Sequence, residues 1–383
     1  MSMTKSLSVL TLALSAAASA EPAETLKQQV DELYAALNNS DSPGCAVGVI
    51  HRGNYIHTAG YGMANLELGV ALDADSVFRI GSVSKQFTAM AVHLMAQDGL
   101  IDLDADIHTY LPDLVNYDTE VTIRTMLGHV SGLPDYEDSL VTGTGDSASA
   151  YALQSAVGGP FRMGNADYLT IAEFYDVAKR IQPTHAPLTK FEYSNLTYFL
   201  FSMLVEEVTG KTLREYADAR IFQPLGMSHS LFSDNGSELI KNRATGYKPD
   251  GKGGFATNMT NLYWVGDGGV HTSLNDFLLW ERNFRQPQLG KDPAKLIAAM
   301  NTPNSDITDG EALYGNGQGM STGTGEMVYE HSGWWLGFAS HFARYPEREL
   351  SVVSLCNDDS QDPEAYAHKL VQLSSVRAIV EGD

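Results

Sequence analysis

Segments with the pattern of β-strands lie at both ends of this 383-residue chain, and a long region with helical periodicity separates them. Strand patterns occupy residues 45–50 and 55–61, joined by a turn at His51-Arg52-Gly53-Asn54, and then residues 327–332, 338–345 and 350–356. One antiparallel sheet built by both chain ends, flanked by helices and carrying an inserted all-helical lobe, accommodates this order. The sequence therefore predicts an α+β fold.

Apolar residues at helical spacing indicate where the helices lie. One such pattern runs from Ser82 to Asp98 and ends at Gly99, a residue typical of helix C-termini. We expect an α/β lobe made of residues 21–80 and 246–383, and a helical lobe made of residues 81–245. The other helical patterns cover residues 23–38, 122–127, 170–181, 196–208 (before Gly210) and 363–380.

The first 20 residues have the pattern of a secretory signal peptide. Lys5 supplies the positive charge, a short leucine-rich run follows, and Ala18-Ser19-Ala20 fits the small-residue cleavage rule. Cleavage near Ala20 predicts a mature chain of residues 21–383 in the periplasm or outside the cell. The apolar run is shorter than a membrane span requires, and no later stretch is long and apolar enough to be one.

The charge balance narrows the range of partners. Lys and Arg number 25 against 47 Asp and Glu, which gives a net charge of -22. Such a surface repels phosphate backbones and anionic lipids, so nucleic-acid binding and membrane binding through a basic patch are disfavoured. A hydrophobic fraction of 43% argues against a disordered chain. A small-molecule or peptide substrate, including one derived from the cell wall, is compatible with this charge.

The chain has two cysteines, Cys45 and Cys356, both in strand patterns. Export permits a disulfide between them, but two buried free thiols fit the sequence at least as well. No CxxC, HxxEH or HExxH pattern supports a zinc site. We therefore expect no metal and no organic cofactor.

A Ser-x-x-Lys motif, Ser82-Val83-Ser84-Lys85, opens the helix predicted from residue 82. Residues three apart on a helix share a face, so Lys85 is predicted to point at the Ser82 hydroxyl, whereas Ser84 faces elsewhere. A lysine acts as a base toward serine when burial lowers its pKa. A second Ser-x-x-Lys, at Ser2, lies in the predicted signal peptide and is a coincidence.

Two further motifs follow in order along the chain. Tyr193-Ser194-Asn195 offers a phenol that relays protons and an amide that binds substrate, and it precedes a predicted helix. His331-Ser332-Gly333 ends a predicted strand. Each pattern is expected roughly once by chance, and each has a rival here, at Tyr314-Gly315-Asn316 and His51-Arg52-Gly53. Their joint order and context therefore carry the argument.

In that order and context the chain resembles the class C β-lactamase and DD-carboxypeptidase-like serine hydrolases. The resemblance spans nearly the whole mature chain and implies an antiparallel sheet beside a helical lobe, with the site between them. Residues 43–50, 78–82, 127–134, 224–227 and 268–273 match the family in addition to the three motifs.

The resemblance also implies roles for individual residues. Ser82 is the expected nucleophile, which forms an acyl-enzyme, and Lys85 and Tyr193 jointly serve as its base and proton relay. Asn195 is expected to contact the substrate amide. His331, Ser332 and Gly333 take the position that recognises a substrate carboxylate or carbonyl, and the backbone N–H groups of Ser82 and Trp334 form the oxyanion hole.

Two departures from the family's pattern affect the expected substrate. His331 stands where the class C β-lactamases have lysine, and a neutral imidazole supplies no fixed positive charge for an anionic β-lactam. We therefore expect a DD-peptidase, D-aminopeptidase or esterase with weak or no β-lactamase activity. Trp334-Trp335 follow directly, and they fit either stacking on substrate or packing at the sheet edge.

Several alternatives remain open from the sequence. The same fold also suits a penicillin-binding sensor that is acylated without turnover. Gly319-Met320-Ser321-Thr322-Gly323 fits the nucleophile elbow of α/β-hydrolases, but a strand rather than a helix is predicted to follow it. His129 and His271 are interpreted as structural residues. The Gly- and Ser-rich segment 141–166 is predicted to be a long loop that caps the cleft.

Overall fold

The structure is a computed structural model that describes residues 25–141, 152–162, 167–308, 310, 312–323 and 325–382. The predicted signal peptide and most of the predicted cap segment 141–166 therefore lie outside the described residues. Among the described residues, every helix is too short or too polar to cross a bilayer.

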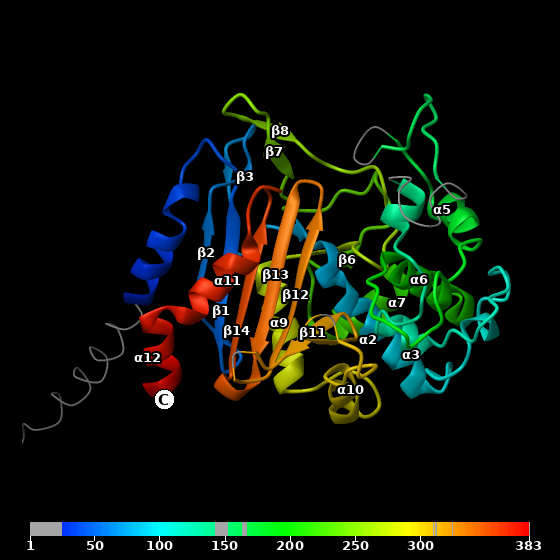
Figure 1. Cartoon of the computed structure of the whole chain (residues 1–383). Helices are drawn as coiled ribbons and strands as arrows, with labels where there is room; N and C mark the ends of the chain where they lie inside the picture. Colours follow the sequence, from blue (N-terminus) through cyan, green and yellow to red (C-terminus); the bar gives the residue numbers. More distant parts are fainter. Residues whose placement is uncertain are drawn as a thin grey trace, which may run out of the picture.

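A seven-stranded antiparallel sheet forms the centre of the molecule (Figure 1). Its strand order is β10-β11-β12-β13-β14-β1-β2, so the C-terminal strand β14 pairs with the N-terminal strand β1, with Cys45 opposite Cys356. The prediction that both chain ends build one sheet is confirmed. The strands are β1 (Cys45–His51), β2 (Asn54–Tyr61), β10 (Leu313–Gly315), β11 (Gln318–Ser321), β12 (Val328–Trp335), β13 (Phe338–Tyr345) and β14 (Leu350–Cys356).

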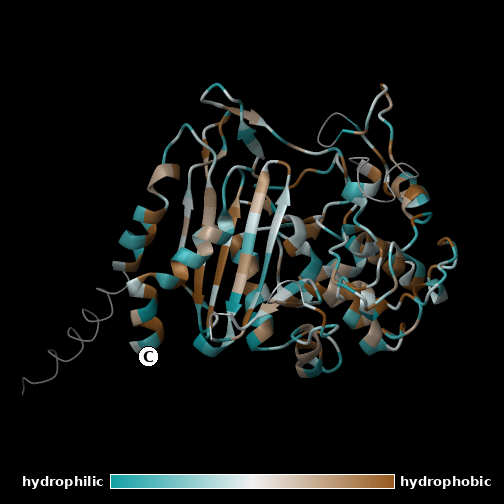
Figure 2. Ribbon diagram, viewed as in Figure 1, coloured by the Kyte–Doolittle hydropathy of each residue, from teal (hydrophilic) through white to brown (hydrophobic). Residues whose placement is uncertain are grey.

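Helices from both chain ends cover one face of this sheet. The helical residues 25–33, α11 (Pro363–Gln372) and α12 (Ser374–Gly382) enclose an apolar core with β1, β13 and β14. Figure 2 shows apolar residues concentrated in the central strands and polar residues on the outer sides of these helices. The single final helix predicted for 363–380 is wrong, because the backbone leaves helical geometry at Leu373, where ψ is 137°.

The opposite face of the sheet packs against α9 (Leu274–Arg285) and the helices of the middle region. Thr122 and Thr170 cap their helices with side-chain hydrogen bonds, and Gly99 and Gly210 end theirs with φ of 76° and 68°. The helices of the middle region are α2 (Lys85–Asp98), α3 (Ile123–Leu127), α5 (Ile171–Ala178), α6 (Asn195–Thr209), α7 (Leu213–Ala217) and α8 (Gln223–Leu225). A further helix, α10 (Pro293–Met300), follows α9 in the chain.

Short strands complete the fold: β3 (Met63–Asn65) pairs with β4 (Val70–Ala71), and β7 (Tyr247–Pro249) pairs with β8 (Phe255–Thr257). A three-stranded sheet is formed by β5 (Phe78–Arg79), β9 (Val270–Thr272) and β6 (Leu231–Phe232), and its strand β5 comes directly before the Ser-x-x-Lys turn in the chain. This sheet fixes the start of that turn, because Ile80 N–H bonds the carbonyl of Val270.

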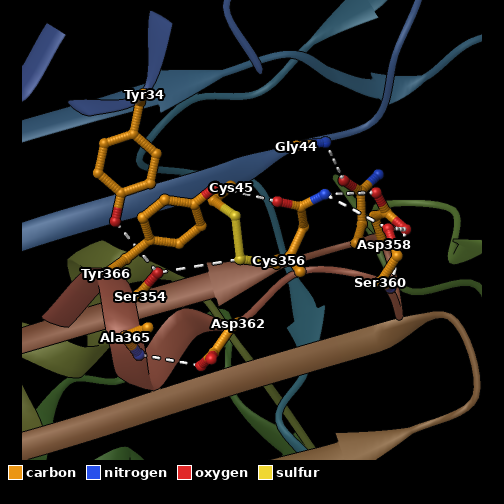
Figure 3. The surroundings of a disulfide bond; sticks show 12 residues. Tyr34, Gly44, Cys45, Ser354, Cys356, Asp358, Ser360, Asp362, Ala365 and Tyr366 are labelled. Carbon is orange, nitrogen blue, oxygen red and sulfur yellow. Dashed lines mark hydrogen bonds between the residues drawn. A yellow bond between two sulfur atoms is a disulfide. The ribbon is translucent and has the colours of Figure 1, made fainter. Parts of the chain in front are cut away.

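Cys45 and Cys356 form a disulfide between β1 and β14, which decides a question that the sequence left open. Figure 3 shows the bond beside the rings of Tyr34 and Tyr366, whose centroids are 4.6 Å apart. Both cysteines are fully buried. The bond links segments 311 residues apart and so closes the sheet covalently across the two chain ends.

Candidate active site

Ser82 lies in a single 3-10 turn, η2 (Gly81–Ser84), that leads directly into α2. Side chains three residues apart are eclipsed in such a turn, which places Lys85 over Ser82. Lys85 Nζ donates a hydrogen bond to Ser82 Oγ at 3.1 Å. As predicted, Ser84 points elsewhere, and its hydroxyl accepts a bond from Val270 N–H.

Lys85 is fully buried, and fixed oxygen atoms surround its ammonium group. Besides Ser82, Nζ donates to Asn195 Oδ1 at 2.6 Å and to the carbonyl of Asp267 at 2.8 Å. Burial lowers the pKa of Lys85 to about 8, although nearby carboxylates oppose the shift. At neutral pH a minor but substantial fraction of this lysine is therefore uncharged and able to accept a proton.

Tyr193 is the third predicted catalytic residue, and the fold brings it to the same place. Its hydroxyl interacts with that of Ser82, and Lys85 Nζ lies 4.9 Å from the centre of its ring. Burial raises the pKa of Tyr193 well above 10, so the phenol is protonated at neutral pH. In this state Tyr193 donates a proton rather than removes one.

His129 holds Tyr193 in position. Its ring lies 4.3 Å from the Tyr193 ring, measured between centroids, and its Nδ1 accepts the backbone N–H of Ser194. His129 is fully buried, adopts a φ of 55°, and has a pKa well below 6.5 because of burial. The sequence interpretation of His129 as structural therefore misses that it supports a site residue directly.

Asn195, the first residue of α6, uses both ends of its amide within the site. Its Oδ1 binds Lys85, while its Nδ2 donates to Asp135 Oδ2 at 3.0 Å and to Glu137 Oε1 at 3.4 Å. Burial raises the pKa of Asp135 to about 6 and that of Glu137 to about 7. An acidic pair thus lies one side chain away from the lysine.

His331 reaches the site from within β12, not from its end, because the strand continues to Trp335. Its Nδ1–H donates to the carbonyl of Ser332, so its Nε2 accepts the hydroxyl proton of Tyr314 at 2.9 Å. Burial lowers the pKa of His331 to about 3, with a further contribution from Lys85. The imidazole is therefore neutral, and both of its nitrogen atoms are engaged.

Ser332 lies on the other face of the sheet, which corrects its predicted role in substrate recognition. Neighbouring residues of a strand point to opposite faces, so the side chain beside His331 turns away from the site. The Ser332 hydroxyl instead donates to Glu364 Oε2 at 2.6 Å and lies 2.8 Å from His341 Nδ1.

Gly333 lets β12 approach the Ser-x-x-Lys turn more closely than a side chain would allow. A Cβ atom at this position would lie 2.2 Å from the carbonyl oxygen of Ile80 and 2.8 Å from the backbone nitrogen of Ser82. Trp334 N is likewise close to Gly81. The two backbone N–H groups predicted to form the oxyanion hole thus belong to adjacent segments, and their catalytic role stays a prediction.

A family model described as Beta-lactamase matches residues 25–375, which is most of the chain and includes all three motifs. The chain belongs to the β-lactamase family of serine hydrolases. The family and the α+β fold predicted from the sequence are thereby confirmed.

Among curated relatives of this β-lactamase family chain is a D-aminopeptidase of Gluconobacter oxydans, 29% identical over 330 residues, which cover 86% of this chain and 58% of the relative. Protein flp of Staphylococcus aureus is 25% identical, over 90% of this chain and 65% of its own length. The chain therefore spans about three-fifths of these relatives.

Solved structures share the fold at lower identity. A penicillin-binding protein homologue from Pyrococcus abyssi superposes with a TM-score of 0.76 at 23% identity, over 95% of this chain and 78% of that one. A D-amino acid amidase from Ochrobactrum anthropi gives a TM-score of 0.69 at 22% identity, over 95% of this chain and 100% of its own.

Four residues of this family site escaped the sequence interpretation. Asp135 and Glu137 follow directly after the family-like stretch 127–134, and that adjacency was the available signal. In the sequence Tyr314 appears only as the rival of Tyr193, yet both tyrosines lie in the site, 6.2 Å apart between ring centroids. The sequence indicates a structural role for His129, and this residue supports Tyr193 within the site.

Two other sequence interpretations concern residues away from the nucleophile. Ser321 ends β11 and is followed by β12, so the rival nucleophile elbow has the hairpin context that the sequence predicted. Trp335 is buried against Trp264 and Arg79, whereas Trp334 is 48% exposed. Of the two tryptophans, only Trp334 is free to meet a substrate.

Proposed function

We propose that this protein is an exported serine amidase that releases the amine following an N-terminal D-amino acid, as in D-aminoacyl amides, through an acyl-enzyme on Ser82. The observation that carries the proposal is the 3.1 Å hydrogen bond between Ser82 Oγ and the buried ammonium of Lys85. It joins a nucleophile to a base whose pKa of about 8 suits neutral conditions.

Acylation begins with neutral Lys85 accepting the Ser82 proton as Oγ attacks the substrate carbonyl. The N–H groups of Ser82 and Trp334 stabilise the oxyanion that forms. Tyr193, protonated and hydrogen-bonded to Ser82, then donates its proton to the departing amine and is reprotonated by Lys85. Lys85 and Tyr193 therefore act as one unit.

The acidic pair supports a substrate with a free amine. Asp135 and Glu137 are linked through Asn195 to the catalytic lysine, so their carboxylates lie within a few ångströms of the reacting centre. Glu137 as a residue is exposed although its carboxylate group is partly desolvated, so a substrate ammonium group can reach this carboxylate and pair with it. The names D-aminopeptidase and D-amino acid amidase among the similar proteins are consistent with such a substrate.

The third motif argues against substrates that need a captured carboxylate. His331 is neutral and its nitrogen atoms are already bonded, so this face of the site supplies no cation. DD-carboxypeptidase and β-lactamase activities, which depend on an anionic group in the substrate, are therefore expected to be weak. Small esters lack this requirement and should be cleaved.

Export is part of the proposal. The disulfide between Cys45 and Cys356 requires an oxidising compartment, in agreement with the signal-peptide pattern of residues 1–20. Detection of the mature N-terminus near Glu21 in secreted or periplasmic material would test it, and an intact N-terminus in the cytoplasm would contradict it.

The decisive experiment is a substrate panel of D-aminoacyl amides, their L forms, D-Ala-D-Ala peptides, short p-nitrophenyl esters and penicillins. Ser82→Ala should abolish turnover and labelling by a serine-directed reagent, while Ser321→Ala retains both. Full activity of Ser82→Ala would refute the proposed nucleophile. Labelling by penicillin with no turnover of any amide or ester would instead support the sensor function.

A further inference from the structure

Three potential metal ligands meet on the face of the sheet opposite the active site. They are Glu330 on β12, His341 on β13 and His368 on α11. The carboxylate oxygen and the two imidazole nitrogens all lie within 4.8 Å of one another. None of these residues takes part in the proposed hydrolysis.

Two of the three separations fit a tetrahedral metal ion. Glu330 Oε2 lies 3.4 Å from His341 Nε2 and 3.3 Å from His368 Nε2. Ligands bound to zinc at ~2.0–2.1 Å with tetrahedral angles are ~3.3–3.4 Å apart. The side chain of His368 is 45% exposed, so it is free to make the small adjustment that closes the third edge.

The surroundings of His341 prepare it as a ligand. A carboxylate only accepts, so the Ser332 hydroxyl donates to Glu364 and must itself accept the Nδ1–H of His341. With its proton held on Nδ1, His341 presents Nε2 toward Glu330. That atom is buried, and among the described residues it makes no hydrogen bond of good geometry, with Glu330 Oε2 3.4 Å away. Metal-binding histidines commonly have their second nitrogen held by a hydrogen-bond acceptor, and here the Ser332 hydroxyl, oriented by Glu364, is that acceptor.

Nearby carboxylates and an open groove also make the cluster suitable for binding a cation. Glu364 and Asp362 add negative potential at His368, and the cluster contains no lysine or arginine among its ligands or their direct partners. Glu330 and His368 line a groove of about 670 Å³ between the sheet and the helices α11 and α12. The groove provides an entry path and room for a water molecule as fourth ligand.

We propose that Glu330, His341 and His368 bind one zinc ion, with Ser332 and Glu364 positioning His341. The ion would fasten α11 to β12 directly behind His331, and it would stabilise the folded sheet rather than act in hydrolysis. Residues 330, 341 and 368 come from three separate elements, which explains why no short zinc motif exists in the sequence. The alternative is a direct contact of Glu330 with the two histidines without a metal ion.

Zinc titration of the full mature protein tests the proposal. The protein is prepared without a histidine tag, stripped with EDTA, and followed by calorimetry and by its melting temperature. We expect one zinc bound per chain and a melting temperature that rises with zinc, because an ion that binds only the folded state stabilises it. Co²⁺ should give the intense visible absorption of a tetrahedral site.

Variants identify the ligands. His368→Ala, on an exposed position that folding tolerates, should abolish both binding and the thermal shift, and Glu330→Gln should do the same. Ser332→Ala should weaken binding ~10–100-fold, the usual effect of losing a residue that orients a ligand. His108→Ala is the matched control, because it removes a histidine paired with Asp106 in the other part of the molecule and should leave zinc binding unchanged.

Absence of stoichiometric zinc binding by the folded wild-type protein would overturn the proposal, as would equal affinity in His368→Ala. In either case Glu330 contacts the two histidines without a metal ion. The proposed amidase activity is measured separately and does not depend on the outcome, because no step of it uses this ion.

Discussion

The hydroxyl of Tyr314 lies 2.9 Å from Nε2 of His331 and donates its proton to it. Since Nδ1 donates to a backbone carbonyl, the histidine of the third motif has neither a charge nor a spare proton to offer a substrate. Because of this contact, the site differs from those in which a charged lysine at this position binds an anionic substrate. It also gives the first prediction.

Substrates with a free carboxylate after the scissile bond should be cleaved poorly. For one D-aminoacyl dipeptide, we expect the C-terminal amide to have a kcat/KM at least ~10-fold higher than the free acid, because a charge-assisted hydrogen bond worth ~1.5–3 kcal/mol is absent and the buried site desolvates the anion. Steady-state kinetics on the matched pair measure this. A free acid that is the better substrate would contradict the assignment of His331.

The rate should depend on the ionisation of Lys85. Burial lowers its pKa from 10.5 to about 8, and only the neutral form accepts the serine proton. For an uncharged ester, kcat/KM should therefore rise with pH and level off above about 8. For a D-aminoacyl amide it should fall again as the substrate amine, of pKa ~7.7–8.0, loses its proton. A flat ester profile from pH 6 to 9 would exclude Lys85 as the base.

The acidic pair should select for a free amine. Glu137→Gln should raise KM for a D-aminoacyl amide roughly 10-fold, as expected for one partly exposed ammonium–carboxylate contact. It should leave KM for the N-acetylated substrate unchanged. The control is Asp138→Asn, which removes the neighbouring exposed carboxylate and should leave KM for both substrates unchanged. Equal effects of Glu137→Gln on both substrates would show that Glu137 does not bind the amine.

Close approach at Gly333 should be essential. Gly333→Ala places a methyl group 2.2 Å from the Ile80 carbonyl and should push β12 away from Ser82, which lowers kcat by at least ~100-fold through loss of an oxyanion donor. Gly319→Ala in the neighbouring strand β11 is a matched control, since its nearest neighbour would be 3.5 Å away. It should remain active. A normal kcat in Gly333→Ala would show that the backbone N–H of Trp334 is not part of the oxyanion hole.

The disulfide should contribute to stability without taking part in catalysis. Replacing Cys45 and Cys356 by Ala removes a link across 311 residues, and we expect the free energy of unfolding to fall by about 2–4 kcal/mol. Thermal melts with and without reductant measure it. The variant should melt at the same temperature in both, whereas the wild type should lose stability once reduced. A wild-type protein indifferent to full reduction would contradict this.

Local patterns in the chain predicted those parts of the molecule that short-range forces control. The helix ends at Gly99 and Gly210 follow from left-handed backbone geometry at glycine, and the Ser82–Lys85 pair follows from the three-residue spacing in a helical turn. The prediction of a single C-terminal helix was wrong because the apolar periodicity continues through Leu373, whereas the helical backbone geometry stops there. Apolar spacing gives no signal for a break of one residue.

Local periodicity and spacing were enough to predict the sheet that both chain ends build, the helical insertion, and the three motifs with their order. Which face of β12 meets the nucleophile depends on how the strand packs in the folded chain, and this packing puts His331 in the site and Ser332 behind it. It also decided that Cys45 bonds Cys356, that Tyr314 joins Tyr193, and that Glu330 meets two histidines. These contacts join residues distant in sequence, and strand register and packing bring them together.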